Sequence, residues 1–324
     1  MIPLPGLFAL SFVLAGGAAL LLTPLVRRLA LAARTVDEPS ARRVHDRPTP
    51  SWGGLAIIGG FVVAVVGIGL TKHSALPDGL SRSQLVGLLL GGLFVAAIGV
   101  VDDRFHVRAK TKLAGQIIGA ALLVPFGVTI QFVSNPFGGG MIALYPWAGA
   151  IFTVCWVVAT TNAINLVDGL DGLAAGISVM AGFTLGVIAA LRGQPGLAVV
   201  AFALSGAAAG FLPYNFHPAR IFMGDTGAYF LGFALGAITL LGAFKVAASI
   251  AIFVPVLVLA FPLLDTVSTA LRRYRRGQPV FGADREHLHH RLLAVGLSHR
   301  GAVLFTYFVT LVSCAVALWI ARPR

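Results

Sequence analysis

Residues 83–103 read SQLVGLLLGGLFVAAIGVVDD, an apolar run that ends in two adjacent carboxylates. The run has no charged residue before Asp102, and about 20 apolar residues are enough for a helix to cross the hydrocarbon core of a bilayer. Its residues do not alternate between polar and apolar, as the strands of a transmembrane barrel would. The stretch therefore predicts a transmembrane helix that presents Asp102 and Asp103 at one membrane face.

The rest of the chain repeats this pattern. Of its 324 residues, 57% are hydrophobic and 11% are charged, whereas soluble domains carry about 25% charged residues. We expect an all-α polytopic membrane protein of about ten transmembrane helices that forms a single domain over residues 1–324. The ten apolar runs begin near Leu4, Gly53, Ser83, Lys112, Met141, Leu173, Pro195, Asp225, Val246 and Gly301.

The distribution of positive charge predicts the orientation of these helices. If the basic loops are cytoplasmic, the inside segments hold 18 of the 24 Lys and Arg residues, and both termini lie outside. Eleven of the twelve carboxylates then lie at the inner face, and only Asp78 lies outside. The net charge of +12 is explained by this insertion rule and by anionic lipid, so we expect no nucleic acid partner. The segment 130–145, rich in Gly, is predicted as an outside loop or hairpin.

The first polar motif, GVVDDRFHVRAKTKL, spans residues 99–113. Neighbouring residues on a helix point about 100° apart, so one of Asp102 and Asp103 is expected to bind or position a ligand while the other orients it. A solvated helix end with paired charges is the alternative. Acids that follow an uninterrupted apolar run are costly to keep beside lipid, which favours a functional site.

The second motif, TTNAINLVDGLDGLAAG, spans residues 160–176 and places Asn162, Asn165, Asp168 and Asp171 at successive spacings of three. On a helix such a row drifts by about 60° at each step, so it wraps around the helix. A helix cap would explain one or two of these residues. Four in register indicate a functional site.

The third motif, HPARIFMGDTGAYFLG, spans residues 217–232 and places Asp225 at the start of an apolar run. An N-cap that satisfies free backbone N–H groups is a strong alternative for a single Asp in this position. Together with the other acids of the inner face, Asp225 becomes a candidate ligand of Mg²⁺, which prefers one or two carboxylates and substrate phosphate oxygens.

The fourth motif, FGADREHLHHRLL, spans residues 281–293. Its three histidines have no Cys nearby and are flanked by arginines, so contact with phosphate or proton handling fits better than zinc. A basic loop on anionic lipid is the alternative, and it leaves the histidines unexplained.

These four motifs, in this order and on one side of ten apolar runs, resemble those of the polyprenyl-phosphate N-acetylhexosamine-1-phosphate transferases, the family that includes phospho-MurNAc-pentapeptide translocase. The resemblance runs from about Val36 to Leu293. HLHH preceded by DRE looks like the branch that uses UDP-GlcNAc and undecaprenyl phosphate, because the translocase branch typically has three consecutive histidines.

The resemblance implies a multi-pass enzyme of the bacterial inner membrane with its active site on the cytoplasmic face. Such an enzyme transfers GlcNAc 1-phosphate from UDP-GlcNAc to undecaprenyl phosphate and releases UMP, in the first membrane step of a cell-envelope polysaccharide pathway. A homodimer is plausible for the family.

The resemblance also implies residue roles. Asp225 and Asp168 would hold Mg²⁺, or Mn²⁺ in its place, while Asp102 or Asp103 and His290 would be catalytic. The substrate-binding residues would be Lys112, Asn165, Asp168, Asp171, Arg285, His287 and His289.

Two other functions remain open from the sequence. The same chemistry could use another UDP-N-acetylhexosamine donor. An ion-coupled transporter also combines intramembrane acids with Gly-rich helices, but it predicts acids near the middle of the bilayer and internal symmetry.

Overall fold

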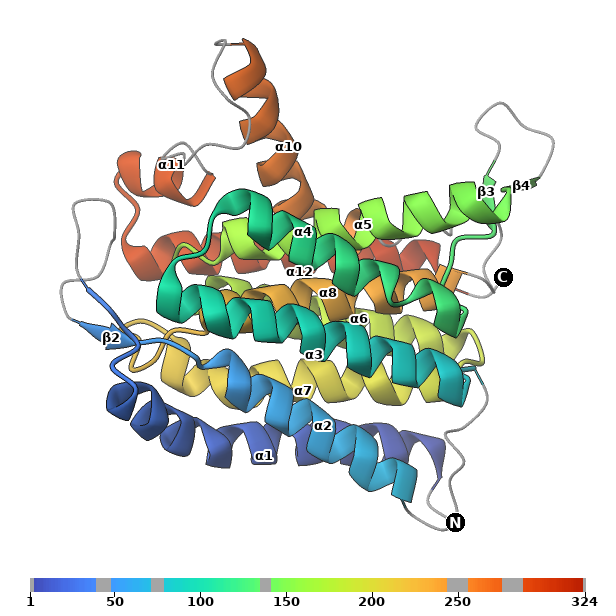
Figure 1. Ribbon diagram of the computed structural model, residues 1–324, viewed down its shortest axis with the longest axis horizontal. Helices are drawn as coiled ribbons and strands as arrows, with labels where there is room; N and C mark the ends of the chain where they lie inside the picture. The colour runs from blue at the N-terminus through green and yellow to red at the C-terminus, as the bar shows by residue number, and fades with distance from the viewer. Residues whose placement is uncertain are drawn as a thin grey trace.

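The computed structural model describes residues 3–38, 48–70, 79–134, 141–243, 256–275 and 288–322. Within these ranges the long helices form a bundle whose axes run roughly side by side, and α10 stands out from it at a steep angle (Figure 1). The helices are α1 (Leu4–Ala32), α2 (Gly54–Leu70), α3 (Arg82–Phe105), α4 (Ala109–Ala121), α5 (Pro146–Val167), α6 (Leu173–Leu191), α7 (Pro195–Asn215), α8 (Gly224–Ala243), α10 (Ala260–Arg275), α11 (Leu288–Ala294) and α12 (His299–Ile320).

The helix lengths confirm a polytopic all-α membrane protein. In the described part of the chain, seven helices are long and apolar enough to cross a bilayer, namely α1, α3, α5, α6, α7, α8 and α12, and α2 is a shorter apolar helix. The predicted span near Lys112 is instead the 13-residue α4, which at about 1.5 Å per residue is too short to cross about 30 Å of hydrocarbon. It is followed by the 3₁₀ helix η1 (Val124–Phe126). The run predicted near Val246 begins outside the described residues.

Two short strand pairs interrupt the helices. Strands β1 (Val36–Asp37) and β2 (Thr49–Pro50) pair antiparallel after α1 and before α2. Strands β3 (Phe132–Ser134) and β4 (Met141–Ala143) form an antiparallel pair before α5, so the hairpin predicted within 130–145 is confirmed. As a result α5 begins at Pro146, and the span that we predicted from Met141 starts five residues later.

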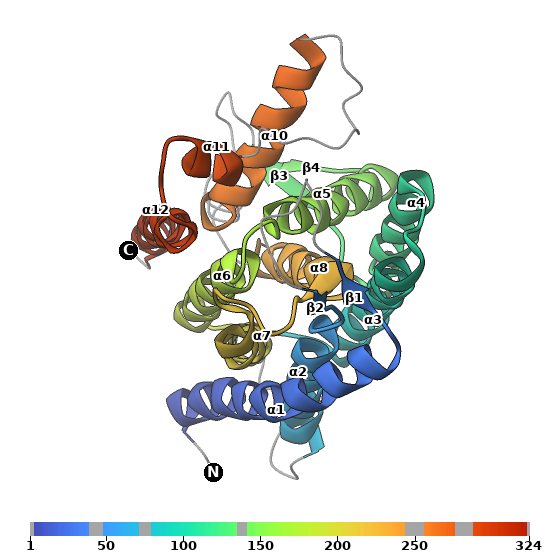
Figure 2. The same cartoon turned by 90° about the vertical axis from the view of Figure 1, so that its left-hand side faces the viewer.

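Small residues let the helices approach closely. A Cβ atom added to Gly206 of α7 would lie 2.1 Å from the carbonyl oxygen of Phe12 in α1, and one added to Gly99 of α3 would lie 2.5 Å from Thr226 of α8. Close packing of this kind is the usual basis of helix association in membranes, where lipid is as apolar as the side chains. Most of helix α8 is buried, and it packs against α2, α3, α5, α6 and α7 (Figure 2).

The connections bring all the described polar motifs to one end of the bundle. Helix α3 ends where α4 begins, α5 ends where α6 begins, and α7 ends where α8 begins, each after a short loop. Helix α12 also begins at this end, and Figure 2 looks onto it, with β1 and β2 facing the viewer. The acids therefore gather at one face of the membrane domain.

Candidate functional site

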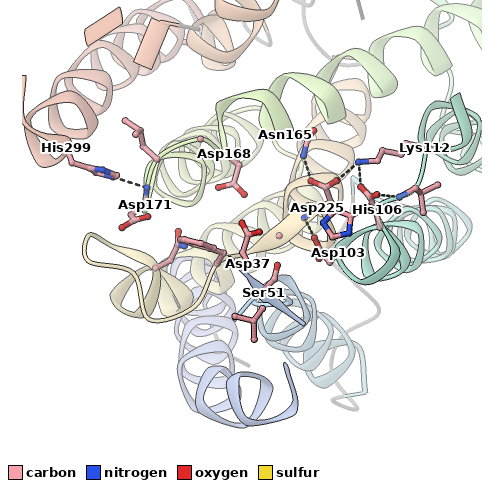
Figure 3. Close-up of a pocket in the computed structure, with 18 residues that line it drawn as sticks. Asp37, Ser51, Asp103, His106, Lys112, Asn165, Asp168, Asp171, Asp225 and His299 are labelled. Atoms are coloured by element: carbon pink, nitrogen blue, oxygen red, sulfur yellow. Dashed lines mark hydrogen bonds and ion pairs between the residues drawn. The ribbon is translucent and has the colours of Figure 1, made fainter. Parts of the chain in front are cut away.

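A pocket of about 520 Å³ opens at this end of the bundle (Figure 3). The loops between α3 and α4, α5 and α6, and α7 and α8 contribute to its lining, as do β1 and the start of α12. The residues of the first three motifs that line it are Asp102, Asp103, Lys112, Asn165, Asp168, Asp171 and Asp225. Residues more than a hundred positions apart thus face one cavity.

Asp103 caps the first turn of α8 from the neighbouring helix α3. Its Oδ1 accepts a hydrogen bond from the backbone N–H of Asp225 at 2.7 Å. Its Oδ2 accepts from the backbone N–H of Thr226 at 3.2 Å and from the Thr226 hydroxyl at 2.6 Å. An acid at a helix N-terminus satisfies free N–H groups and favours the helix dipole. The N-cap role that the sequence left open for Asp225 is therefore filled by Asp103.

The carboxylate of Asp225 is held by three other side chains. Asn165 donates to its Oδ1 at 2.7 Å, while the Tyr229 hydroxyl at 2.9 Å and Lys112 Nζ at 3.2 Å donate to its Oδ2. Asn165 comes from α5 and Lys112 from α4, so three helices meet at this one carboxylate.

Asp102 is buried beside this group. Its Oδ1 accepts from the backbone N–H of Val107 at 2.7 Å, which fixes the turn that leaves α3. Its Oδ2 forms an ion pair with Lys112. Lys112 therefore bridges Asp102 and Asp225 and offsets part of their negative charge.

We expected the four polar residues of the second motif to lie on one helix, and this expectation is wrong. Helix α5 ends at Val167, and Asp168 and Asp171 lie in the turn before α6. Gly172 has φ +81°, a conformation that favours glycine. Asn162 bonds to Gln116 at 2.6 Å and is not among the residues that line the pocket.

Asp168 points into the middle of the pocket (Figure 3). Burial, together with the nearby carboxylates of Asp225, Asp103 and Asp171, raises its pKa to about 8. A group so affected by negative charge gains stability from a cation placed beside it. Asp168 and Asp225 are hard oxygen donors of the type that Mg²⁺ prefers, so the residues present fit a magnesium ion.

Asp171 fastens three segments together. Its Oδ2 accepts from His217 Nδ1 at 2.8 Å and from the backbone N–H of Ala219 at 3.0 Å. Its backbone N–H donates to His299 Nε2 at 3.0 Å. Beside them, Tyr307 of α12 donates to the carbonyl of Gly172 at 2.6 Å. The loops before α6 and α8 are thereby tied to the start of α12.

Asp171, His217 and His299 also lie close enough together to hold a metal ion. However, the two imidazole rings stack with centroids 4.1 Å apart and planes 19° apart. An imidazole nitrogen binds a metal along a lone pair in the plane of its ring, so nearly parallel stacked rings do not aim at one point between them. Asp171 Oδ2 and His299 Nε2 are moreover engaged in hydrogen bonds. We interpret the cluster as a set of hydrogen bonds that holds these segments together.

Comparison with known proteins supports the interpretation of this pocket. Residues 85–243 match Glycosyl transferase family 4. The chain is 38% identical over 299 residues to a probable undecaprenyl-phosphate N-acetylglucosaminyl 1-phosphate transferase of Bacillus subtilis, covering 92% of this chain and 81% of that protein.

The chain belongs to the polyprenyl-phosphate N-acetylhexosamine-1-phosphate transferase family. It is also 40% identical over 306 residues to a decaprenyl-phosphate N-acetylglucosaminephosphotransferase of Mycolicibacterium smegmatis, covering 88% of this chain and 75% of that protein. Identity to a phospho-N-acetylmuramoyl-pentapeptide-transferase of Moorella thermoacetica is 34% over 330 residues, covering 95% of this chain and 96% of that protein. The resemblance seen in the four motifs is therefore confirmed.

The histidine motif of this transferase is only partly described. Arg285 and His287 lie outside the described residues. The backbone of His289 and His290 belongs to α11, which packs against α12, but their side chains also lie outside the description. The roles of these four residues stay predictions.

The pocket contains residues that the sequence analysis missed. Asp37 lines it from strand β1, Ser51 lines it from just after strand β2, and His299 lines it from the start of α12. Asp37 and Ser51 reach the pocket through strand pairing over a dozen residues, and His299 through a contact with Asp171 that lies 128 positions away. Neither kind of contact leaves a local sequence pattern. Tyr229 does not line the pocket but is hydrogen-bonded to Asp225. It could have been found from the sequence, because it lies four residues after Asp225 and hence on the same face of α8.

Proposed function

We propose that this transferase moves GlcNAc 1-phosphate from UDP-GlcNAc to undecaprenyl phosphate with the help of Mg²⁺, giving undecaprenyl-diphosphate-GlcNAc and UMP. It works at the cytoplasmic face of a bacterial inner membrane and starts a cell-envelope polysaccharide. The observation that carries the proposal is the gathering of four carboxylates, Asp102, Asp103, Asp168 and Asp225, with Lys112 in one pocket at the end of a membrane bundle. The names of the Bacillus and Mycolicibacterium relatives support N-acetylglucosamine as the sugar and a polyprenyl phosphate as the acceptor.

The chemistry explains this set of residues. An oxygen of the lipid phosphate attacks the phosphorus that carries GlcNAc, and the bond from that phosphorus to the oxygen bridging it to the uridine phosphate breaks. UMP leaves with the bridging oxygen. Both partners are anionic, so the barrier falls when their charge is neutralised and the attacking oxygen is held in line. Magnesium supplies such neutralisation when bound.

Asp225 and Asp168 are the proposed metal residues, and Lys112 is proposed to meet the nucleotide phosphates. Of the two adjacent acids, Asp102 is the better candidate for the lipid phosphate. Both oxygens of Asp103 are occupied by the first turn of α8. Asp102 also has both oxygens engaged, but its Oδ2 pairs with a lysine that lines the pocket. A carboxylate there can keep the attacking phosphate deprotonated.

A different donor is the second candidate, because the Moorella relative, at 34% identity, is named for a muramoyl-pentapeptide substrate. The transporter alternative gains no support, since the pocket residues come from the loops and helix ends at one end of the bundle.

The proposal is tested with the full chain purified in detergent. UMP release and lipid product are measured with undecaprenyl phosphate, Mg²⁺ and each of UDP-GlcNAc, UDP-GalNAc and UDP-MurNAc-pentapeptide. We expect turnover to be fastest with UDP-GlcNAc and to stop on addition of EDTA. Faster turnover with another donor would replace UDP-GlcNAc, and turnover with none of them would reject the proposed reaction.

A further inference from the structure

Tyr229 occupies an unusual position beneath the pocket. It lies one turn into α8 after Asp225 and is 1% exposed, the bulkiest fully buried side chain in the described part of the chain. Its hydroxyl donates to Asp225 Oδ2 at 2.9 Å and lies 3.4 Å from Asp102 Oδ2. A buried phenol needs a hydrogen-bond partner, and here that partner is a carboxylate of the pocket.

The two carboxylate oxygens of Asp225 accept different numbers of these hydrogen bonds. Each carboxylate oxygen offers two acceptor positions. On Oδ2 both are used, by Tyr229 and Lys112. On Oδ1 one is used by Asn165. The side chain of Asp102 is also hydrogen-bonded to the Asp225 carboxylate. Of the two oxygens, Oδ2 holds two of the donors from Tyr229, Lys112 and Asn165, and Oδ1 holds one.

We propose that Tyr229 restricts Asp225 to binding a divalent cation through Oδ1 alone, and that this restriction favours Mg²⁺ over Ca²⁺. The inference rests on the metal site of the proposed function. Mg²⁺ takes six ligands in strict geometry and is usually bound through one oxygen of a carboxylate, whereas Ca²⁺ takes six to eight and readily accepts both. Because the Tyr229 hydroxyl is bonded to Oδ2, a Ca²⁺ ion bound at Oδ1 cannot also bind Oδ2.

A purely structural role for Tyr229 predicts something else. Loss of its hydroxyl would then lower stability and weaken all divalent cations alike. Only a restriction on the binding mode of Asp225 changes the preference between two cations of the same charge and different size. The ratio of the two affinities is therefore the informative quantity.

The test is a competition in the detergent-solubilised full chain. Mn²⁺ binding is followed by electron paramagnetic resonance, and Mg²⁺ or Ca²⁺ is titrated until half of the Mn²⁺ is displaced. We expect Tyr229→Phe, which keeps the ring and removes the hydroxyl, to shift the ratio of the two half-displacement concentrations about tenfold towards Ca²⁺. Tyr307→Phe, which removes the hydrogen-bonded hydroxyl of another, partly buried tyrosine, is the matched control and should keep the wild-type ratio.

A second variant covers failure of Tyr229→Phe to fold. Lys112→Met frees the same oxygen from the pocket side, where Lys112 is 29% exposed, and should move the ratio in the same direction. A folded Tyr229→Phe with the wild-type ratio overturns the inference, as does an unchanged ratio in Lys112→Met, or Mn²⁺ binding that Asp225→Ala leaves intact. Since the measurement needs no turnover, failure of the transfer reaction alone would reject the proposed function and not this inference.

Discussion

Asp103 and Asp225 meet at the first turn of α8, but their hydrogen bonds give them different tasks. Both oxygens of Asp103 accept hydrogen bonds from backbone N–H and hydroxyl groups of that turn. Asp225 accepts its hydrogen bonds from side chains and lines the pocket together with Asp168. The sequence predicted that these acids converge, because each follows or precedes an apolar run at the same membrane face. The sequence could not assign different roles to adjacent acids, because each role depends on which helix the side chain contacts.

Replacement of Asp225 tests the metal site at this scale. We expect Asp225→Ala to lower the rate of UMP release by at least about 100-fold, because a proposed metal ligand is lost and Lys112 loses one of its two carboxylate partners. The protein should stay folded, with an unchanged elution volume in size-exclusion chromatography. Near-normal turnover at saturating Mg²⁺ would remove Asp225 from the metal site.

The roles of Asp102 and Asp103 are distinguished by comparing the melting temperature and the rate of UMP release of two variants. Asp103→Ala should destabilise the protein by about 1 to 2 kcal/mol, because a helix cap is lost. Asp102→Asn should keep more of the wild-type melting temperature while losing more of the rate. Thermal unfolding and UMP release are measured for both. If Asp103→Ala leaves the melting temperature unchanged and stops turnover, Asp103 is the acid at the lipid phosphate.

At the scale of helices, hydropathy predicted most of the bundle and misjudged its breaks. The long runs became α1, α3, α6 and α7 with starts close to those predicted. α4 is short because its apolar run gives way to η1, and α5 starts late because the preceding residues pair as strands. Periodicity also extended α5 through Asp171, whereas the glycines that follow Val167 open a turn there.

The contact between α3 and α8 gives a test of helix packing. Gly99→Ala would bring a Cβ to 2.5 Å from the backbone of Thr226, next to Asp225. We expect the helices to separate, at a cost of about 1 to 3 kcal/mol, with a loss of transfer. Gly67→Ala on α2 meets no atom within 4 Å and is the matched control. Equal melting temperatures and rates for the two variants would show that α8 is not held by this contact.

At the scale of the whole molecule, the proposed reaction requires the pocket end of the bundle to face the cytoplasm. The excess of Lys and Arg in the loops predicts this orientation. In the described part of the chain, the loop between α3 and α4 and the loop between α7 and α8 lie at the pocket end. Contacts such as His299 with Asp171 join residues 128 positions apart. They shape the pocket without leaving a sequence pattern, which is why they were not predicted.

The two ends of α3 report the orientation. In a background with Cys155 and Cys314 changed to Ser, Arg108→Cys just beyond the pocket end should resist a membrane-impermeant thiol reagent in intact cells and react in inverted vesicles. Arg82→Cys at the other end should react in intact cells. The reverse pattern would place the pocket outside.

The central claim, that this pocket joins a sugar phosphate to a lipid phosphate, is tested most directly by following two labels at once. UDP-GlcNAc carrying ³²P in the phosphate next to the sugar and ¹⁴C in GlcNAc is incubated with the purified chain, Mg²⁺ and undecaprenyl phosphate. We predict that both labels enter the lipid in equal amounts, matched by the UMP released, and that Asp225→Ala transfers neither. Release of UMP with both labels left in water, or entry of ¹⁴C without ³²P, would contradict the account.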